Sequence, residues 1–243
     1  MLDFFPEYKN IKNLDDRKRN ITLKDLLTMS SGLSWDGDNI DMPKIIESDD
    51  WIKSILDLPM DHDPGTYFKY CTGHRYLTDG ILQKTTGLNA KEFAVQNILT
   101  PLGITNYYWK TYEPNNIARS GGDFRFRPID LLKFGQLYLN EGIWNDKRLI
   151  PKEWVKLSTS AHIKANERSD YGFQWWHPNK DHPVSTLTGE NDVIMASGAG
   201  GQKIWIVPHL NLVAVSTARN RKQENASILW DYIIRFAQDI KKQ

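Results

Sequence analysis

The stretch MASGAGGQKIWIVP, Met195–Pro208, places a serine and three glycines directly in front of an alternating apolar run. The run indicates a β-strand, and the glycines indicate a tight bend that leads into it. A phosphate-binding loop is excluded, because the glycines lack the G-x-G-x-x-G spacing, no Gly-Lys-Ser/Thr follows them, and phosphate loops precede a helix. The bend is therefore either a structural turn or part of a catalytic pocket.

The segments around this stretch favour an antiparallel sheet. Short segments rich in β-branched and aromatic residues, separated by turn signals, occupy residues 171–176, 192–197, 202–208 and 212–218. Their close succession predicts a meander. A helix is predicted over 226–242, and the apolar residues of one of its faces are Ile228, Tyr232, Ile233, Phe236 and Ile240. That helix is expected to cover one face of the sheet.

The chain before residue 160 is expected to be mainly helical. In ITLKDLLTM, Thr22 is placed as an N-cap and Asp25 lies in the first turn. Apolar periodicity bounded by proline or glycine predicts further helices over 43–59, 74–87, 90–103, 128–142 and 151–157. The predicted class is mixed α/β (α+β), with a mainly helical lobe at about 20–160 and strands with a terminal helix at about 165–243.

The composition excludes several classes of partner. The 243 residues are 40% hydrophobic, which is enough for a sizeable core. The formal net charge is +1 with mixed signs along the chain, so neither nucleic acid nor an anionic membrane is an expected partner. No run approaches the roughly 18 apolar residues of a membrane span, and the first ten residues lack the pattern of a signal peptide. The chain is expected to be soluble, in a compartment that the sequence leaves open.

Neither a metal nor a cofactor is expected. The six histidines show no H-E-x-x-H motif, and the single cysteine, Cys71, cannot build a thiolate zinc site or an internal disulfide. His74 follows Cys71 by three residues, but a catalytic thiol and its base normally meet in space and not along the chain. We interpret Cys71 as a small structural residue.

Five segments, taken in order, resemble one protein family. They are ITLKDLLTMSSGLSWD, PGTYFKYCTGHRYLTDGILQKTTG, PIDLLKFGQLYLNEGIWNDKRLIPKEW, YGFQWW and ASGAGGQKIWIVPHLNLVAVST. Their order is similar to that in the serine β-lactamase-related proteins, which include class C β-lactamases, penicillin-binding peptidases, serine esterases and 6-aminohexanoate-dimer hydrolases. The amide hydrolase and esterase branch is the most similar. The resemblance covers nearly the whole chain and implies a single β-lactamase/transpeptidase-like domain over 1–243.

The resemblance implies chemistry that uses three motifs. In the first, a serine at the start of a helix attacks a carbonyl, and a lysine three residues later takes its proton. In the second, Tyr-x-Asn, the tyrosine shares in proton transfer, and Tyr70 occupies that place. A phenol acts as a base only where nearby cations lower its pKa. Thr72 stands where the motif has asparagine, so the motif's contact with a substrate amide is altered.

The third motif, Lys-Thr-Gly in β-lactamases, lies on a strand that lines the pocket. The matching residues are Ala196, Ser197 and Gly198, and the resemblance implies that the backbone N–H of Ala199 forms one arm of an oxyanion hole. The glycine-rich edge, which includes Gly201, permits close approach of substrate to backbone. Because alanine replaces the lysine that meets a β-lactam carboxylate, a neutral amide or ester is expected as substrate before a penicillin.

The first motif is absent from these residues. No serine has a lysine three residues on, and Thr66 with Lys69 is the one hydroxyl pair with that spacing. The pair follows a Pro-Gly turn and lacks the helix that the geometry requires. The resemblance therefore implies a chain truncated before the Ser-x-x-Lys motif, without the N-terminal strands and the catalytic helix. Loss of that central helix is expected to expose apolar surface, so that the chain is marginal alone or recruits a partner.

Three interpretations stay open. In the first, the chain is a fragment or homologue of a serine hydrolase that cleaves small amides or esters through an acyl-enzyme, inactive alone because the nucleophile and its lysine are absent. In the second, it is a binding module that keeps the pocket walls, from Trp35 and Tyr70 to the 197–201 edge, without chemistry. In the third, it is an interaction protein that pairs with another copy or with a separately encoded N-terminal piece.

Overall fold

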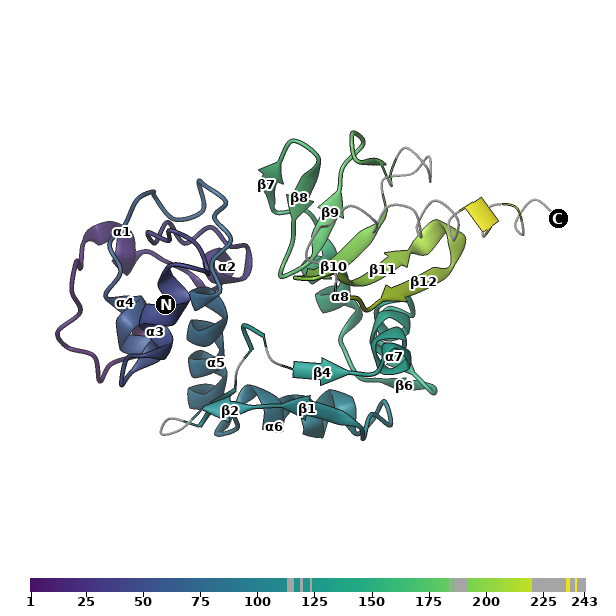
Figure 1. Cartoon of the computed structure of the whole chain (residues 1–243), viewed down its shortest axis with the longest axis horizontal. Helices are drawn as coiled ribbons and strands as arrows, with labels where there is room; N and C mark the ends of the chain where they lie inside the picture. Colours follow the sequence, from purple (N-terminus) through teal and green to yellow (C-terminus); the bar gives the residue numbers. More distant parts are fainter. Residues whose placement is uncertain are drawn as a thin grey trace. The chain divides into compact units, whose positions relative to one another are not determined.

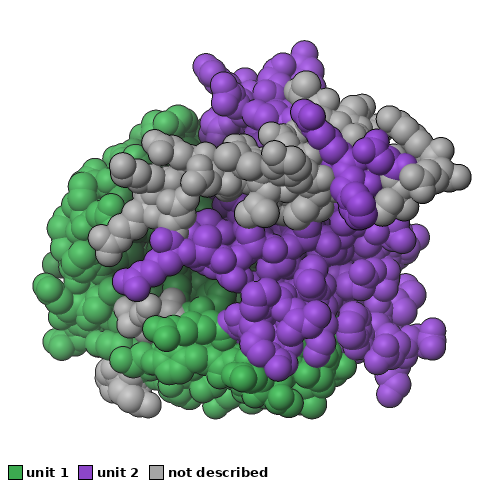
Figure 2. Space-filling model, turned by 45° about the vertical axis from the view of Figure 1, so that its right-hand side comes forward, with its two compact units in different colours: residues 1–125 green, residues 126–243 purple. Residues whose placement is uncertain are grey.

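The computed structural model describes residues 1–112, 116–118, 120–122, 124–183, 185, 192–219, 235, 236 and 239. The chain divides into two compact units, residues 1–125 and 126–243 (Figure 2). This division lies earlier than the boundary near residue 160 expected from the sequence, because the helix over 128–139 packs on strands of the second unit. Each unit has its own hydrophobic core.

The first unit consists mainly of short helices packed around one long helix, α5 (Figure 1). Its helices are η1 (Leu2–Phe4), α1 (Asp16–Arg19), α2 (Leu23–Leu27), α3 (Asp41–Ile46), α4 (Trp51–Leu56), α5 (Gly73–Thr86), α6 (Ala90–Ala94) and the π-helix η2 (Val95–Leu99). Its strands are β1 (Tyr107–Trp109), β2 (Thr111–Tyr112) and β3 (Ile117–Ala118), and β4 (Phe124–Phe126) begins in this unit and ends at the first residue of the second. They form two two-stranded sheets, β1 with β4 and β2 with β3.

Local capping explains where two of these helices begin and end. Thr22 is the N-cap of α2, as predicted. It forms a capping box with Asp25, in which the Asp25 N–H donates to Thr22 Oγ1 at 3.2 Å and the Thr22 N–H donates to Asp25 Oδ2 at 2.8 Å. Helix α5 ends at Gly87, whose φ of 75° is in the left-handed region that glycine adopts readily. The C-terminal end of α5, the long helix that follows Tyr70, is therefore set by a glycine in the sequence.

The single helix predicted over 43–59 is wrong, because two helices, α3 and α4, occupy that segment. The Asp50 backbone is extended, and its side chain accepts a hydrogen bond from the Lys53 N–H at 3.0 Å. Asp50 thus acts as an N-cap that starts a new helix. The apolar repeat continues across the break because both short helices bury their apolar residues in the same core.

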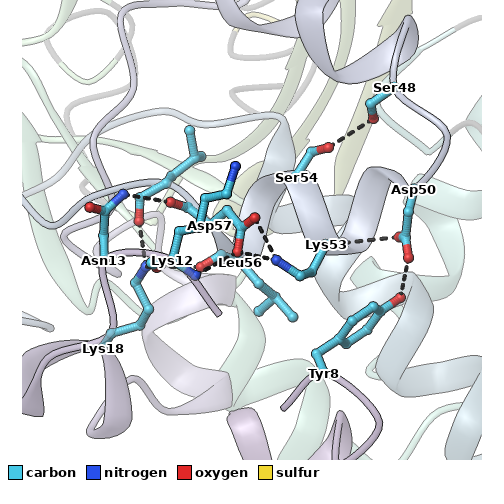
Figure 3. Close-up of polar contacts among 11 residues, drawn as sticks. Tyr8, Lys12, Asn13, Lys18, Ser48, Asp50, Lys53, Ser54, Leu56 and Asp57 are labelled. Atoms are coloured by element: carbon cyan, nitrogen blue, oxygen red, sulfur yellow. Dashed lines mark hydrogen bonds and ion pairs between the residues drawn. The ribbon is translucent and has the colours of Figure 1, made fainter. Parts of the chain in front are cut away.

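A buried lysine joins the N-terminal segment to the end of α4 (Figure 3). Lys18 is fully buried, and its Nζ donates to the carbonyl oxygens of Lys12 at 2.9 Å, Leu56 at 2.9 Å and Leu58 at 2.5 Å. Leu56 is the last residue of α4 and Leu58 follows it by two residues, so the ammonium lies at the helix end where a cation interacts favourably with the dipole. The Asp57 carboxylate accepts a further hydrogen bond from the Lys12 N–H at 2.8 Å. One ammonium group thereby satisfies three backbone acceptors.

The second unit carries a six-stranded antiparallel sheet (Figure 1). Its elements are α7 (Pro128–Leu139), β5 (Ile143–Trp144), β6 (Lys147–Arg148), α8 (Lys152–Thr159), β7 (Ile163–Asn166), β8 (Ser169–Tyr171), β9 (Trp176–Pro178), β10 (Ile194–Gly198), β11 (Gln202–Val207), η3 (Pro208–Leu210) and β12 (Leu212–Ser216). The strand order is β12-β11-β10-β9-β8-β7, so the predicted meander is confirmed.

The strand predicted over 171–176 is instead the turn between two strands. Tyr171 ends β8 and pairs with Trp176, which begins β9. Gln174 between them has a φ of 65°, which a strand residue does not adopt. Aromatic residues at both ends of the turn explain why the segment resembles a single strand in sequence.

Helix α7 packs on strands β11 and β12. Gly135 makes this close approach possible, because a Cβ at that position would lie 2.5 Å from Val213 Cγ1 and 2.9 Å from Ile204 Cγ2. Phe134 and Tyr138 of the same helix pack with Trp175 and Ile204 in one core cluster. A second cluster, which includes Met195 and Trp205, comes from the other face of the strands, since side chains alternate between faces.

The helix predicted over 226–242 lies for the most part outside the described residues. In the part of the chain that is described, no helix has both the length and the apolar character needed to cross a membrane.

Candidate functional site

Tyr70 lies at the end of a loop that forms backbone hydrogen bonds with the segment just after α2. The Gly65 N–H donates to Ser30 O at 2.8 Å, and the Lys69 N–H donates to Met29 O at 2.8 Å. Gly65 has a φ of 78°, as its Pro-Gly turn requires. These contacts place Tyr70 just ahead of helix α5, so its ring is held by a fixed loop.

The guanidinium of Arg75, from the first turn of α5, donates a hydrogen bond to the phenol oxygen of Tyr70. It also lies 5.3 Å from the centre of the Tyr70 ring. Burial raises the pKa of Tyr70, the Arg75 charge opposes that rise, and the Asp38 charge adds to it. The phenol therefore has a cationic neighbour, but within this chain its pKa stays above the usual value.

Asp38 holds two of the residues that the sequence assigns to the pocket. Its Oδ1 accepts hydrogen bonds from Trp35 Nε1 at 3.1 Å and from the Thr72 N–H at 3.3 Å, and its Oδ2 accepts from Thr72 Oγ1 at 2.6 Å. Trp35 and Thr72 are both buried. Because Thr72 donates its hydroxyl hydrogen to Asp38, its hydroxyl oxygen can only accept a further hydrogen bond.

A pocket of about 220 Å³ opens beside these residues in the first unit. Its lining residues are Asp38, Met42, Ile46, Thr72, Tyr76, Gly121 and Gly122. Close packing of Gly121 on Thr72 forms part of the wall, since a Cβ on Gly121 would lie 2.3 Å from Thr72 Cγ2. The pocket thus combines aliphatic walls with one carboxylate.

The glycine-rich bend from the sequence joins β10 to β11 in the second unit. Gly198 pairs with Gln202 across the hairpin, and Gly200 and Gly201 turn the chain with φ values of 79° and 92°. Gly198 and Ala199 are exposed at the tip. The bend therefore leaves its backbone accessible, as a substrate-lining edge needs, and two of its glycines are required by the turn.

Lys203 lies opposite Ser197 in the same hairpin, and its Nζ donates to Ser197 Oγ at 3.2 Å. Its Nζ also lies 5.4 Å from the centre of the Trp205 ring, and burial lowers the pKa of Lys203. This cation is not predicted by the motif, because the motif lysine would stand at position 196 along the strand. Two signals in the sequence could have placed Lys203 opposite Ser197 across the hairpin. They are the length of the bend and the alternation of apolar residues over 203–207.

The structure places the sequence-predicted residues in two groups. Trp35, Tyr70 and Thr72 lie in the first unit, where Asp38 links Trp35 to Thr72. Strand β10 and the bend, which hold the 196–201 group, belong to the second unit.

Two weaker candidates from the sequence make other contacts. His74 Nε2 is 2.6 Å from Ser31 Oγ, deep in the first unit, and burial raises the pKa of the Cys71 thiol to about 12. Thr66 Oγ1 donates to Asp63 O at 2.7 Å, in a loop outside the helices. Among the described residues, no group of three or more His, Cys, Asp or Glu side chains is placed to hold a metal ion.

Comparison with known proteins identifies one family. Residues 4–238 match the family model described as Beta-lactamase. No match was found among curated proteins.

Solved structures share the fold over nearly the whole chain. A Bacillus anthracis protein provisionally assigned as a 6-aminohexanoate-dimer hydrolase is 19% identical, with a TM-score of 0.78 over 99% of this chain and 66% of that protein. Unliganded simvastatin synthase from Aspergillus terreus is 16% identical, with a TM-score of 0.73 over 100% of this chain and 77% of the synthase. An octameric penicillin-binding protein homologue from Pyrococcus abyssi is 19% identical, with a TM-score of 0.64 over 94% of this chain and 60% of the homologue.

At these identities the likeness shows the fold alone. It confirms the predicted β-lactamase/transpeptidase-like class. The chain spans between 60% and 77% of the length of these three proteins.

Proposed function

Because the chain belongs to the beta-lactamase family, we propose that it is part of a serine hydrolase that cleaves small amides or esters through an acyl-enzyme. The family predicted from five sequence segments is confirmed by the match over residues 4–238. The main support for the proposal is the environment of Tyr70. Its phenol is hydrogen-bonded to a guanidinium, and its pKa is affected by the charge of Asp38, a residue that lines an open pocket. A group that passes a proton during acyl transfer needs a partner that stabilises its charged form, and Arg75 is such a partner for Tyr70.

In this proposal Tyr70 transfers a proton between the nucleophile and the leaving group. The Ala199 N–H donates to the oxyanion of the tetrahedral intermediate, a role supported by the exposure of Ala199 at the tip of a tight bend. The remaining proposed contacts with substrate are those of Trp35, Thr72, Ala196, Ser197, Gly198 and Gly201.

The proposal places the nucleophile outside these 243 residues. None of their serines is followed by lysine three residues later, and the hydroxyl of Thr66 is bonded to a loop carbonyl. We propose that a separate piece carrying a Ser-x-x-Lys segment associates with this chain. Self-association of the chain is the other proposed arrangement.

Covalent labelling tests where the nucleophile lies. The 243-residue chain is exposed to a fluorophosphonate and, separately, to benzylpenicillin, and its intact mass is measured. No stable adduct is expected, because none of the serines is followed by lysine three residues later. An adduct mapped to any residue of this chain overturns the placement of the nucleophile outside it.

The same labelling on this chain combined with a Ser-x-x-Lys segment tests the hydrolase itself. We expect one fluorophosphonate per molecule, on the serine of the Ser-x-x-Lys segment, and its loss when that serine is changed to alanine. If the combined product neither labels nor hydrolyses a chromogenic ester or anilide, the hydrolase proposal is wrong.

A binding module without chemistry is the second candidate function, and the 220 Å³ pocket with its single carboxylate favours it. The two functions differ in what the chain does alone. A binding module retains its ligand in the 243-residue chain and gains no labelling from the Ser-x-x-Lys segment. A hydrolase gains labelling only when that segment is supplied.

A further inference from the structure

A second pocket of the first unit lies toward the C-terminal end of α5, away from Tyr70. It holds about 350 Å³, within the range of about 300–1,000 Å³ that is usual for small-molecule sites. None of the described residues that line it also lines the pocket beside Asp38. Lys84, which lines it, follows Arg75 by nine residues, or about 14 Å along the helix axis. The pocket is therefore separate from the proposed hydrolase site.

The floor of this second pocket is apolar. It is formed by Phe5, Ile52 of α4 and Ile117 of β3, which are 2%, 4% and 3% exposed. Gly80 lets two of them approach α5 closely, since a Cβ there would lie 3.1 Å from Ile52 Cδ1 and 3.2 Å from Phe5 Cε1. All three side chains belong to the core of the first unit. The floor is therefore preformed and suits an apolar group.

The rim of the same pocket carries two opposite charges. Lys84 Nζ and Glu7 Oε1 form an ion pair at 2.5 Å, and their side chains are 39% and 45% exposed. Lys84 Nζ also lies 5.7 Å from the centre of the Phe5 ring, at the edge of the floor. An exposed pair of this kind contributes little to stability, because water screens it. A ligand that carries both charges can therefore enter between the two groups and leave each of them with a partner.

Tyr8 favours an ammonium group on the Glu7 side of the rim. Its hydroxyl lines the pocket and donates to Asp50 Oδ2 at 2.8 Å (Figure 3). The phenol oxygen can then only accept a further hydrogen bond. An ammonium group has several N–H donors, so it can bind the Glu7 carboxylate and the Tyr8 oxygen together. A ligand carboxylate is left to the ammonium of Lys84.

We propose that this pocket binds an α-amino acid with an apolar side chain. The ammonium group of the ligand lies on Glu7 and Tyr8, its carboxylate lies on Lys84, and its side chain packs on Phe5 and Ile52. Both charges of an α-amino acid are attached at one carbon, which matches a cation and an anion that contact each other at the rim. Binding requires no nucleophile, so the inference goes beyond the proposed hydrolase function and is independent of it.

Titration of the ¹⁵N-labelled 243-residue chain with L-leucine, followed by NMR at the Gly80 and Gln83 amides, tests the proposal. 3-Methylbutylammonium lacks the carboxylate of leucine, and 4-methylpentanoate lacks its ammonium group. We expect each of these probes to bind at least about tenfold more weakly than leucine, because one charged contact is lost. Glycine keeps both charges without the apolar side chain, and it is also expected to bind more weakly than leucine.

Two substitutions separate the two charges of the rim. Glu7→Gln is expected to weaken leucine binding at least about tenfold, while 4-methylpentanoate binds at least as tightly as before, because Lys84 is retained. Lys84→Met is expected to weaken leucine binding similarly, while 3-methylbutylammonium binds at least as tightly as before. The retained probe shows that the pocket of each variant is intact. Asp3→Asn and Lys9→Met remove exposed charges outside the pocket and should leave leucine binding unchanged.

Three results would overturn the amino-acid site. They are the absence of leucine binding to the unaltered chain, leucine binding no tighter than that of either single-charge probe, and an unchanged leucine affinity in Glu7→Gln or in Lys84→Met. None of these measurements involves acyl-enzyme labelling, so the hydrolase proposal is judged separately.

Discussion

The guanidinium of Arg75 donates a hydrogen bond to the phenol oxygen of Tyr70 and lies 5.3 Å from the centre of the same ring. Donation to the phenol oxygen stabilises the phenolate more than the phenol. Burial acts in the opposite direction and dominates, so the pKa of Tyr70 is raised. Arg75 thus supplies from α5 a cation of the kind that a proton-transferring tyrosine requires.

Arg75→Met is expected to raise the pKa of Tyr70 further, because burial then acts without the opposing cation. The pKa is measured by ¹³C NMR of ring-labelled tyrosine across a pH titration, with the Tyr70 resonance identified by its loss in Tyr70→Phe. Arg75→Lys keeps the charge and is expected to lie between the two. An unchanged Tyr70 titration in Arg75→Met would contradict this role.

Lys18→Met is expected to lower the free energy of unfolding by about 3 kcal/mol, because three carbonyl acceptors lose a charged donor. Urea unfolding followed by far-UV circular dichroism measures the change. Lys12→Met removes an equal charge, but the Lys12 side chain is exposed and only its backbone joins the network. Similar destabilisation by the two variants would show that the buried hydrogen bonds of Lys18 (Figure 3) do not account for the loss of stability.

Local signals in the sequence were sufficient for several elements. The capping box of Thr22 and Asp25, the left-handed Gly87 and the meander depend on neighbours within a few residues or on strict alternation. The break before α4 was missed, because the apolar repeat runs through it and the cap by Asp50 looks like one more acidic residue. The Tyr171–Trp176 turn was missed because its aromatic ends imitate a strand.

The site was predicted less completely than the fold, because its contacts depend on tertiary geometry. Tyr70 and Thr72 were proposed as site residues from a motif, but Asp38 lies 34 residues from Thr72 and follows no motif that links them. Lys203 meets Ser197 only once the hairpin register is known. Arg75 is near Tyr70 in sequence, yet the hydrogen bond between their side chains depends on the angle at which the loop before Tyr70 enters α5.

Gly121→Ala is expected to destabilise the first unit by about 1–3 kcal/mol, because the added methyl group meets Thr72 Cγ2 at 2.3 Å and Tyr76 Oη at 3.0 Å. Urea unfolding measures the loss. Gly122→Ala is the matched control, since no described residue lies within 4 Å of a Cβ at that neighbouring position. If the two variants unfold alike, the close packing of Gly121 on α5 does not contribute to stability.

Two buried titratable groups on α5 are expected to give opposite pH dependences of stability. Burial lowers the pKa of His74 to about 3 from 6.5, so between these values only the unfolded chain binds the proton, and stability falls as the pH falls. Burial raises the pKa of Asp79 to about 7 from 3.8, so between these values only the folded chain binds the proton, and stability falls as the pH rises. Each slope is at most about 1.4 kcal/mol per pH unit, so the two largely cancel between pH 4 and 6.5.

Single substitutions are expected to reveal each slope. In His74→Leu, Asp79 is the one member of the pair that still contributes a pH dependence. The free energy of unfolding, relative to that of the unaltered chain, should therefore decrease from pH 4 to pH 6.5. In Asp79→Asn the relative free energy should instead increase over the same range, because His74 no longer has an opposing partner. Urea unfolding at half-unit pH steps measures both, with the exposed Asp49→Asn as a control that should run parallel to the unaltered chain. Parallel curves for all four proteins would mean that neither buried group has the altered pKa on which the cancellation depends.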